Sequence, residues 1–252
     1  MERLFTPRGE AALEAVMRLD PVLAFDFDGT LAPIVDHPDD ARVPVEIAQC
    51  LAELAQRHPV AIISGRSVGD VRARLGFAPR FVIGNHGAED ESSRLPGDAR
   101  DALDALRARI VAAGPALVGA GVTVEDKRYS LALHYRLAPD AALARAAIAA
   151  LLDGLPRGLD SFGGKCVVNV VAAGLPDKGD ALAAIVRRSG AGAACFVGDD
   201  VNDEAVFRRA SAPWLTIRIG VDDPGSQAMF FLDDIAELAV VLRRMRSLSS
   251  LA

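Results

Sequence analysis

Two aspartates flank a phenylalanine in the segment Asp26-Phe-Asp-Gly-Thr30, directly after the apolar run 22–25. If that run is a buried parallel strand, both carboxylates lie at its carboxyl end, where open α/β sheets bind their ligands. Carboxylates so close together repel one another unless a cation bridges them or one of them is protonated. Asp-Gly is also a common turn dipeptide. A turn, however, does not require an aspartate on each side of Phe27, so we expect a functional site here.

A second acidic group follows another apolar run. Gly198-Asp-Asp-Val-Asn-Asp203-Glu204 comes after residues 193–197 and opens a helical segment. Asp203 could cap that helix or complement its dipole. Capping accounts for one carboxylate, whereas this segment has several acidic residues close together. Hard oxygen ligands without a nearby histidine or cysteine favour Mg²⁺, so the segment predicts a metal site.

Two further segments contain residues that could hold an anion. Ser64-Gly-Arg66 follows the apolar run 60–63, and a serine hydroxyl with free N–H groups at a helix N-terminus forms an anion site. Lys178 opens the helical pattern 178–189, where a cation opposes the helix dipole unless it faces a phosphate. Taken alone, each segment is equally compatible with a structural role: an N-cap for Ser64 and a surface position for Lys178.

The elements that must position these residues alternate between strand and helix. Short continuous apolar runs bounded by Gly, Pro or Asp are typical of parallel strands that are covered on both faces. They occur at 22–25, 60–63, 81–83 and 193–197. Helical spacing follows at 45–57, 68–75 and 178–189. This alternation predicts an α/β fold with a doubly wound, Rossmann-like parallel-sheet core.

The middle of the chain has a different pattern. Residues 121–126 and 130–135 alternate between apolar and polar more than the core runs do, and the turn between them suits a hairpin. Helical patterns at 97–113 and 140–152 flank this hairpin, and strands are expected around Leu159 and Val167. We therefore expect an inserted α+β domain at 90–172, with 1–89 and 173–252 forming the catalytic core.

Composition excludes several functions. The 252 residues are 51% hydrophobic and 25% charged, with a formal net charge of −6, which is typical of a soluble globular protein without affinity for nucleic acid or anionic lipid. The sequence contains no apolar run of the ~18 residues that span a bilayer and no signal-peptide pattern. We therefore expect no membrane partner and a cytoplasmic location. The expected assembly is a monomer or weak homodimer, which composition does not determine. Cys50, Cys166 and Cys195 show no metal-ligand spacing, and Cys195 is expected in the core.

The four motifs occur together in one order. DFDGT, the Ser of ISGR, the Lys of DKG and GDDxxDE resemble the motifs of the haloacid-dehalogenase-like superfamily of phosphohydrolases. Within that superfamily the chain is similar to the trehalose-phosphatase family. That similarity rests on FDFDGTLAPI (25–34), ISGR (63–66), GNHGAE (84–89), VEDKRYSLALHYR (124–136) and GDDVNDE (198–204).

The resemblance implies a mechanism for the core residues. Asp26 would be a nucleophile that forms an aspartyl-phosphate, and Asp28 would protonate the leaving sugar oxygen and later accept a proton from water. Ser64 and Lys178 would hold the phosphoryl oxygens. The implied cofactor is Mg²⁺, held by the Asp26 carboxylate, the Asp28 main-chain carbonyl and Asp199, with Asp200 and Asp203 completing or orienting its water shell.

The resemblance also implies a substrate. A cap of this size favours a small phosphosugar, trehalose 6-phosphate in this family, with closure of the cap excluding water. The residues implied to bind the substrate are Arg66, Asn85, His86, Glu125, Lys127, Arg136 and Asn169. Glu125 and Lys127 could instead be an exposed hairpin ion pair, and His134 an ordinary hydrogen-bonding histidine.

Two departures from the family pattern concern the sugar. Asn169 stands where the family usually has a glutamate, and residues 170–174 lack the usual Arg-Pro. An amide keeps an acceptor oxygen but loses the charge that strengthens bonds to sugar hydroxyls. The alternative substrates are related sugar or glycoside phosphates, such as sucrose 6-phosphate or glucosylglycerol phosphate. A phosphosugar mutase and a non-catalytic phosphosugar-binding regulator are the remaining alternatives.

Overall fold

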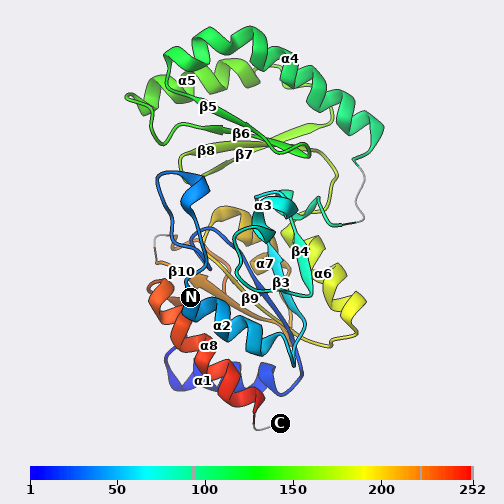
Figure 1. The fold of residues 1–252 in the computed structure, drawn as a ribbon, viewed down its shortest axis with the longest axis vertical. Helices are drawn as coiled ribbons and strands as arrows, with labels where there is room; N and C mark the ends of the chain where they lie inside the picture. Colours follow the sequence, from blue (N-terminus) through cyan, green and yellow to red (C-terminus); the bar gives the residue numbers. More distant parts are fainter. Residues whose placement is uncertain (92–94, 222, 251–252) are drawn as a thin grey trace. The chain divides into compact units, whose positions relative to one another are not determined.

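The structure is a computed structural model that describes residues 1–91, 95–221 and 223–250 of the chain. It consists of two compact units, and the chain passes between them twice (Figure 1). The core unit comprises Met1–Glu91 and Pro176–Ala252, and the inserted unit comprises Ser92–Leu175. The inserted unit extends past residue 172 because Leu175 packs against its apolar side chains.

The described part of the core unit contains a parallel sheet of seven strands in the order β1-β11-β10-β9-β2-β3-β4. Every residue of β2, β3 and β9 is buried, because helices cover both faces of the sheet. The strands are β1 (Glu2–Arg3), β2 (Val22–Phe25), β3 (Val60–Ile63), β4 (Phe81–Ile83), β9 (Ala194–Gly198), β10 (Leu215–Ile219) and β11 (Phe230–Leu232).

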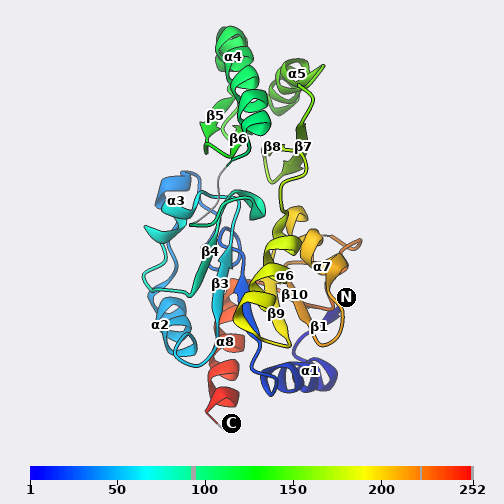
Figure 2. The ribbon, with the colours of Figure 1, turned by 90° about the vertical axis from the view of Figure 1, so that its right-hand side faces the viewer.

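Side chains of successive strand residues enter two separate apolar clusters. Leu23 and Phe25 pack with α1, α2, α3 and α8 on one face, whereas Val22 and Ala24 pack with α6 and α7 on the other. Figure 2 shows α2 and α6 on opposite sides of the sheet. This arrangement confirms the predicted doubly wound α/β core. The helices are α1 (Pro7–Met17), α2 (Val45–Leu54), α3 (Val68–Arg72), α6 (Lys178–Ser189), α7 (Glu204–Arg209) and α8 (Ile235–Ser249), with turns η1 (Pro38–Asp40), η2 (Asn85–Gly87) and η3 (Val201–Asp203).

The inserted unit is an antiparallel sheet with two helices packed on one face. Its strands have the order β5-β6-β8-β7. Leu131 and Val170 of the sheet join one apolar cluster with Leu103 and Leu106, and Leu133 joins a second cluster with Ile148. The elements are α4 (Gly97–Gly119), β5 (Thr123–Asp126), β6 (Ser130–His134), α5 (Ala141–Leu152), β7 (Leu159–Gly164) and β8 (Val167–Ala172).

Helix α4 is longer than the sequence pattern indicates. Its expected end was residue 113, but it continues through Pro115 to Gly119. Leu117 is buried beneath this last turn, and the N–H of Ala120 bonds to the carbonyl of Ala116. Packing of Leu117 thus outweighs the missing N–H of proline. No helix in the described residues is long and apolar enough to cross a membrane.

Candidate active site

The site lies at the carboxyl ends of three neighbouring strands. Asp199, Asp26 and Ser64 follow β9, β2 and β3, which are adjacent in the sheet. The N–H of Asp26 bonds to the carbonyl of Val197 over 2.9 Å, so Asp26 continues the parallel ladder beyond β2. The chain proceeds from β2 toward β3 and β4 and later returns on the other side of β2 with β9. This reversal of strand order is where open α/β sheets bind ligands.

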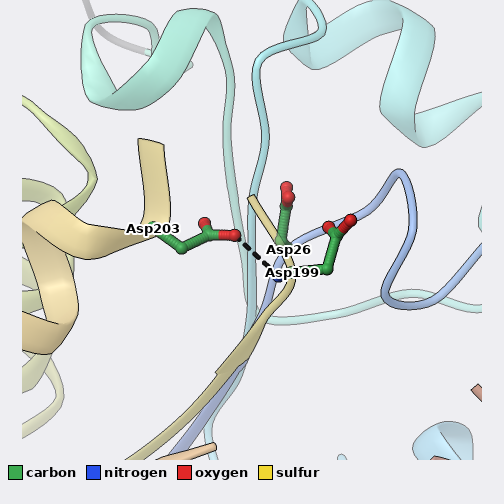
Figure 3. Close-up of side chains that lie close together, drawn as sticks. All are labelled: Asp26, Asp199 and Asp203. Atoms are coloured by element: carbon green, nitrogen blue, oxygen red, sulfur yellow. Dashed lines mark hydrogen bonds between the residues drawn. The ribbon is translucent and has the colours of Figure 1, made fainter. Parts of the chain in front are cut away.

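Three carboxylates meet at this position. Asp26, Asp199 and Asp203 each offer one oxygen, and these oxygens lie within 4.8 Å of one another (Figure 3). All three residues are buried. Gly29 allows this close approach because its φ is +79° and a Cβ there would lie 2.1 Å from Oδ2 of Asp199. Only glycine therefore fits the turn after β2.

Lys178 lies beside these carboxylates. Its Nζ is 2.9 Å from Oδ1 of Asp26 and 2.7 Å from Oδ1 of Asp203, and its exposed fraction is 1%. Lys178 is the first residue of α6. Asp177 caps this helix: its carboxylate accepts from the N–H of Asp180, and the carboxylate of Asp180 accepts from the N–H of Asp177. The alternative of a surface lysine is therefore wrong. Burial would by itself lower the pKa of Lys178, but Asp203 and Asp26 raise it above its ordinary value, so the side chain stays a cation.

The electrostatics of Asp26 indicate how a cation would fit. Burial raises the pKa of the Asp26 carboxyl well above its ordinary value, and the charges of Asp203 and Asp199 raise it further, against the opposing effect of Lys178. With all three carboxyl groups ionised, the single ammonium group of Lys178 would leave excess negative charge in a buried place. A divalent cation bound to hard oxygen ligands would neutralise that charge. The donor set therefore fits a metal such as Mg²⁺.

Asp203 and Asp200 organise the loop after β9. Oδ2 of Asp203 accepts hydrogen bonds from the N–H groups of Asp199 at 2.8 Å and Asp200 at 3.0 Å. Figure 3 shows the Asp203 carboxylate pointing to the main chain at Asp199. Asp200 caps η3 by accepting from the N–H of Val201 at 2.8 Å. The structure thus brings Asp203 into the carboxylate cluster and places Asp200 at its border.

The side chain of Asp28 is turned to Arg66 rather than to the cluster. Nε and Nη2 of Arg66 each donate to one Asp28 oxygen over 2.7 Å. Arg66 also donates to Oδ2 of Asp70 at 2.7 Å and to the carbonyl of Pro38 at 2.9 Å. Its guanidinium lies over the ring of Phe27, 5.3 Å from the centroid. These bonds use four of the five N–H groups of Arg66, which was expected to contact substrate.

Ser64 is fully buried next to Arg66. Its Oγ accepts from the N–H of Arg66 at 3.1 Å, and its own N–H bonds to the carbonyl of Ile83. The N-cap of α3 is Ser67, whose hydroxyl accepts from the N–H of Asp70 at 3.3 Å. The capping alternative for Ser64 is therefore wrong, and its hydroxyl hydrogen can donate to an anion.

Asn85 and His86 adopt a strained backbone beside the Ser64 loop. Their φ angles are +49° and +60°, a region that side chains other than glycine seldom adopt. The N–H of Asn85 bonds to the carbonyl of Arg66 at 2.8 Å, and that of His86 to Ser64 at 2.9 Å. The His86 ring packs on Gly65, where a Cβ would lie 2.4 Å from Cε1. Both residues are thus fixed against the Ser64–Arg66 loop.

The inserted unit holds the other expected binding residues. Pairing aligns Glu125 with Ala132 and Ala132 with Asn169, which places Glu125 and Asn169 in one row across β5, β6 and β8. One oxygen of Glu125 lies 2.9 Å from Nε2 of His134 and 3.5 Å from Nζ of Lys127. Asn169 is buried. Arg136 follows β6 and donates to the carbonyl of Lys165 at 3.2 Å.

Comparison with known proteins identifies the family. The family model of trehalose-phosphatase matches residues 24–99 and 118–230, which include the carboxylate cluster and Lys178. The chain belongs to the trehalose-phosphatase family. This membership confirms the resemblance to that family, which rested on segments 25–34, 63–66, 84–89, 124–136 and 198–204.

Relatives and solved structures agree with the family assignment. The chain is 36% identical over 244 residues to the trehalose-phosphate phosphatase of Mycolicibacterium paratuberculosis, covering 89% of this chain and 62% of that protein. It thus spans less than two thirds of the length of that relative. A structure of a trehalose-6-phosphate phosphatase related protein superposes with a TM-score of 0.73 at 24% identity, over 91% of this chain and 99% of that one. The C-terminal domain of the Candida albicans trehalose-6-phosphate phosphatase superposes with a TM-score of 0.75 at 19% identity, over 94% of this chain and 96% of that one.

Three residues near the site of this trehalose-phosphatase family member were not predicted from the sequence. Thr30, fully buried, donates to Oδ1 of Asp199 at 3.4 Å. Glu89 accepts from Asn85 Nδ2 at 2.7 Å and from the N–H of Val68 at 3.0 Å, which ties the η2 turn to α3. Asp70 binds Arg66. Thr30 lies within segment 25–34 and Glu89 within segment 84–89, both of which resemble the family. No sequence signal marks Asp70.

Proposed function

We propose that this chain is a divalent-metal-dependent phosphatase that hydrolyses trehalose 6-phosphate through a phosphoaspartate on Asp26. The observation that carries the proposal is the position of Asp26, which is buried, 2.9 Å from the Lys178 ammonium and clustered with two further carboxylates. The names of the mycobacterial relatives support the substrate. The geometry supports phosphoryl transfer because an anionic phosphoryl group needs such cationic stabilisation.

In the first step a carboxylate oxygen of Asp26 attacks phosphorus. The bond between Asp26 and phosphorus forms while the bond from phosphorus to the sugar oxygen breaks, and a proton passes from Asp28 to that oxygen. Lys178 and Ser64 hold the phosphoryl oxygens and balance the charge that develops on them. The sugar leaves as a neutral alcohol.

In the second step water attacks phosphorus of the phosphoaspartate. Asp28, now a carboxylate, accepts a proton from the water as the new P–O bond forms and the bond to Asp26 breaks. Inorganic phosphate leaves, Asp26 is a free carboxylate again and Asp28 again carries its proton. The cycle consumes one water and one phosphate monoester.

Mg²⁺ is the proposed cofactor. Carboxylate oxygens of Asp26 and Asp199 and the main-chain carbonyl of Asp28 would hold it, with Asp203 and Asp200 orienting its water shell. When bound, the ion would neutralise part of the phosphoryl charge and act as a Lewis acid.

We further propose that the inserted unit is a mobile cap that provides the contacts to the sugar. The row of Glu125 and Asn169 across its sheet supports this role, because aligned carboxylate and amide oxygens can accept from neighbouring sugar hydroxyls. Lys127 and Arg136 would donate to sugar oxygens, and Arg66, Asn85 and His86 of the core unit would line the sugar-phosphate position.

Asn169 favours one alternative substrate class. Its amide is neutral where the family usually has a glutamate, so the sugar site binds hydroxyls less strongly at this position. A related glycoside phosphate, such as sucrose 6-phosphate or glucosylglycerol phosphate, is therefore the second candidate.

The test is phosphate release with Mg²⁺ and with EDTA. The substrates are trehalose 6-phosphate, sucrose 6-phosphate, glucose 6-phosphate and glucosylglycerol phosphate, with Asp26→Asn as the blank. We expect metal-dependent release with the highest kcat/KM for trehalose 6-phosphate, and no turnover by a folded Asp26→Asn variant. A preference for another sugar that Asn169→Glu reverses would assign the second candidate. Turnover by Asp26→Asn would refute the mechanism, and release in EDTA would refute the metal requirement.

A further inference from the structure

Glu89 closes the turn that follows β4. Gly84 and Glu89 pair as an isolated antiparallel bridge, in which the N–H of Gly84 bonds to the carbonyl of Glu89 over 2.7 Å and the N–H of Glu89 to the carbonyl of Gly84 over 3.1 Å. The side chain of Glu89 folds back over the same turn, where its Oε2 accepts from Nδ2 of Asn85 at 2.7 Å. Glu89 therefore holds the η2 turn through both its main chain and its side chain.

The same carboxylate oxygen reaches the start of α3. Oε2 of Glu89 also accepts from the N–H of Val68, the first residue of that helix, at 3.0 Å. Gly84 leaves room for this arrangement, because a Cβ there would lie 2.6 Å from the nitrogen of Val68 and 2.7 Å from Oε2 of Glu89. Because both donors meet at one oxygen, Glu89 fixes the η2 turn and the start of α3 relative to each other.

The η2 turn holds the loop that contains Ser64. The N–H of His86 bonds to the carbonyl of Ser64, and the N–H of Asn85 bonds to the carbonyl of Arg66. Asn85 and His86 donate these bonds from a backbone with φ angles of +49° and +60°. Such a backbone costs free energy and persists only where surrounding contacts hold it. Glu89 supplies one of these contacts, so its removal should let the turn relax and the Ser64 loop shift.

We propose that Glu89 is a positioning residue for phosphoryl transfer: it fixes the η2 turn, and the turn fixes the loop from which Ser64 holds a phosphoryl oxygen. The inference rests on the proposed function, in which Ser64 has that role. A group that stabilises the transition state must be placed accurately, and a displacement of about 1 Å can cost about 10²-fold in rate. In this scheme Glu89 acts only through the turn.

The alternative role for Glu89 is to stabilise α3 alone. A carboxylate at the first N–H of a helix complements its dipole. Ser67 caps the same helix, because its hydroxyl accepts from the N–H of Asp70 at 3.3 Å. Ser67→Ala therefore weakens the start of α3 and leaves the bonds of Glu89 in place. This variant is the matched control for an effect that acts through the helix.

The experiment measures kcat/KM for trehalose 6-phosphate and p-nitrophenyl phosphate in three variants of Glu89. Glu89→Ala removes the carboxylate, Glu89→Asp keeps the charge but is one methylene shorter, and Glu89→Gln keeps the length and an oxygen that can accept both bonds. We expect Glu89→Ala and Glu89→Asp to lower kcat/KM about tenfold to hundredfold. Glu89→Gln should stay within about threefold of the wild type, because its amide oxygen accepts the same bonds more weakly. Both esters should be affected alike, since they share the phosphoryl group, and Ser67→Ala should leave both values unchanged.

A double-mutant cycle tests the route through Asn85. Asn85→Gly removes the side chain that Glu89 binds, and glycine adopts the positive φ without strain. In that background Glu89→Ala should lower kcat/KM for p-nitrophenyl phosphate by less than about threefold, because residues that act through one contact are not additive. Fully additive losses would overturn the inference.

The remaining outcomes also decide. Wild-type kcat/KM in folded Glu89→Ala and Glu89→Asp would overturn the inference, and so would an equal loss in Ser67→Ala, which would make the helix the cause. A normal Glu89→Asp with an impaired Glu89→Gln would show that charge matters and position does not. A loss confined to the sugar phosphate would place Glu89 among the sugar contacts instead. If Glu89→Ala does not fold, Glu89→Asp carries the decision. Failure of the proposed function is recognised separately, because the wild type would then release no phosphate from either ester.

Discussion

The ammonium of Lys178 lies 2.9 Å from Oδ1 of Asp26, although the lysine begins a helix and the aspartate follows a strand far earlier in the chain. A cation in the first turn of a helix is unfavourable, because the helix dipole is positive at that end. Asp26 and Asp203 form two short ion pairs with Lys178, so the buried ammonium is not left without an opposite charge. The lysine is therefore fixed where an incoming phosphoryl group would need it.

Replacement of Lys178 by methionine should abolish most activity and also lower the stability of the fold, because it leaves Asp26 and Asp203 buried without their cation. Methionine has a similar volume and remains buried, but the charge that stabilises the phosphoryl oxygens is lost. Removing one such preorganised group costs about 10²–10³-fold in kcat. Phosphate release and circular dichroism measure the two effects. Arg187→Met, on an exposed position of the same helix, is the control and should retain full activity. Equal activity in the two variants would remove Lys178 from the site.

The Gly29 turn offers a sharper test of the carboxylate cluster. An alanine methyl group there would lie 2.1 Å from Oδ2 of Asp199 at a φ of +79°, so the cluster must open. Gly190 has a similar φ of +73°, but nothing lies within 4 Å of its added Cβ. We expect both alanine variants to lose about 1 kcal/mol of folding free energy through backbone strain. Gly29→Ala alone should lose Mg²⁺-dependent activity. Loss of activity in Gly190→Ala as well would show that general destabilisation is the cause.

The meeting of Asp26 and Asp199 could be predicted because parallel strands have their carboxyl ends at one edge of a sheet. Both aspartates follow continuous apolar runs, which indicated buried strands directly. The partner of Asp28 could not be predicted in this way. Arg66 was assigned to substrate because its motif follows a strand, but the orientation of its side chain depends on Asp70 and on the carbonyl of Pro38.

Elements remote from the chemistry were harder to read. Strand β11 (Phe230–Leu232) has three residues, and helix α8 begins three residues later. The pairing of β11 with β1 and β10 is a long-range property of the sheet, which local sequence does not show. The end of α4 was misjudged for a related reason. By local rules, Pro115 indicates that the helix ends there. Burial of Leu117 instead stabilises the helical turn that follows the proline, so α4 continues.

The three free thiols should differ sharply in reactivity. Cys166 is exposed, whereas Cys50 and Cys195 are buried. Burial raises the pKa of the Cys195 thiol to about 12 and also raises that of Cys50, so neither forms the reactive thiolate at about pH 8. An aromatic disulfide reagent should therefore label Cys166 in the native chain and all three cysteines after denaturation. Cys166→Ser should abolish native labelling, and rapid labelling of that variant would contradict the burial of the other two.

The inserted unit should lose part of its stability as pH falls. Nε and Nη2 of Arg107 donate to the two oxygens of Asp126 over 2.7 and 2.8 Å, and Arg107 holds the pKa of Asp126 below its ordinary value. A folded-state pKa below the unfolded value of about 3.9 means that the stabilisation is complete above that pH and disappears as pH falls through the folded value.

Because Asp126 is 46% exposed, we expect Asp126→Asn to cost at most about 1 kcal/mol near neutral pH. Thermal unfolding of wild type and variant from neutral to acidic pH should show their midpoints converging. Asp160→Asn, at an exposed position of β7, is the control and should show no such convergence, and a pH-independent gap for Asp126→Asn would disprove the ion-pair explanation.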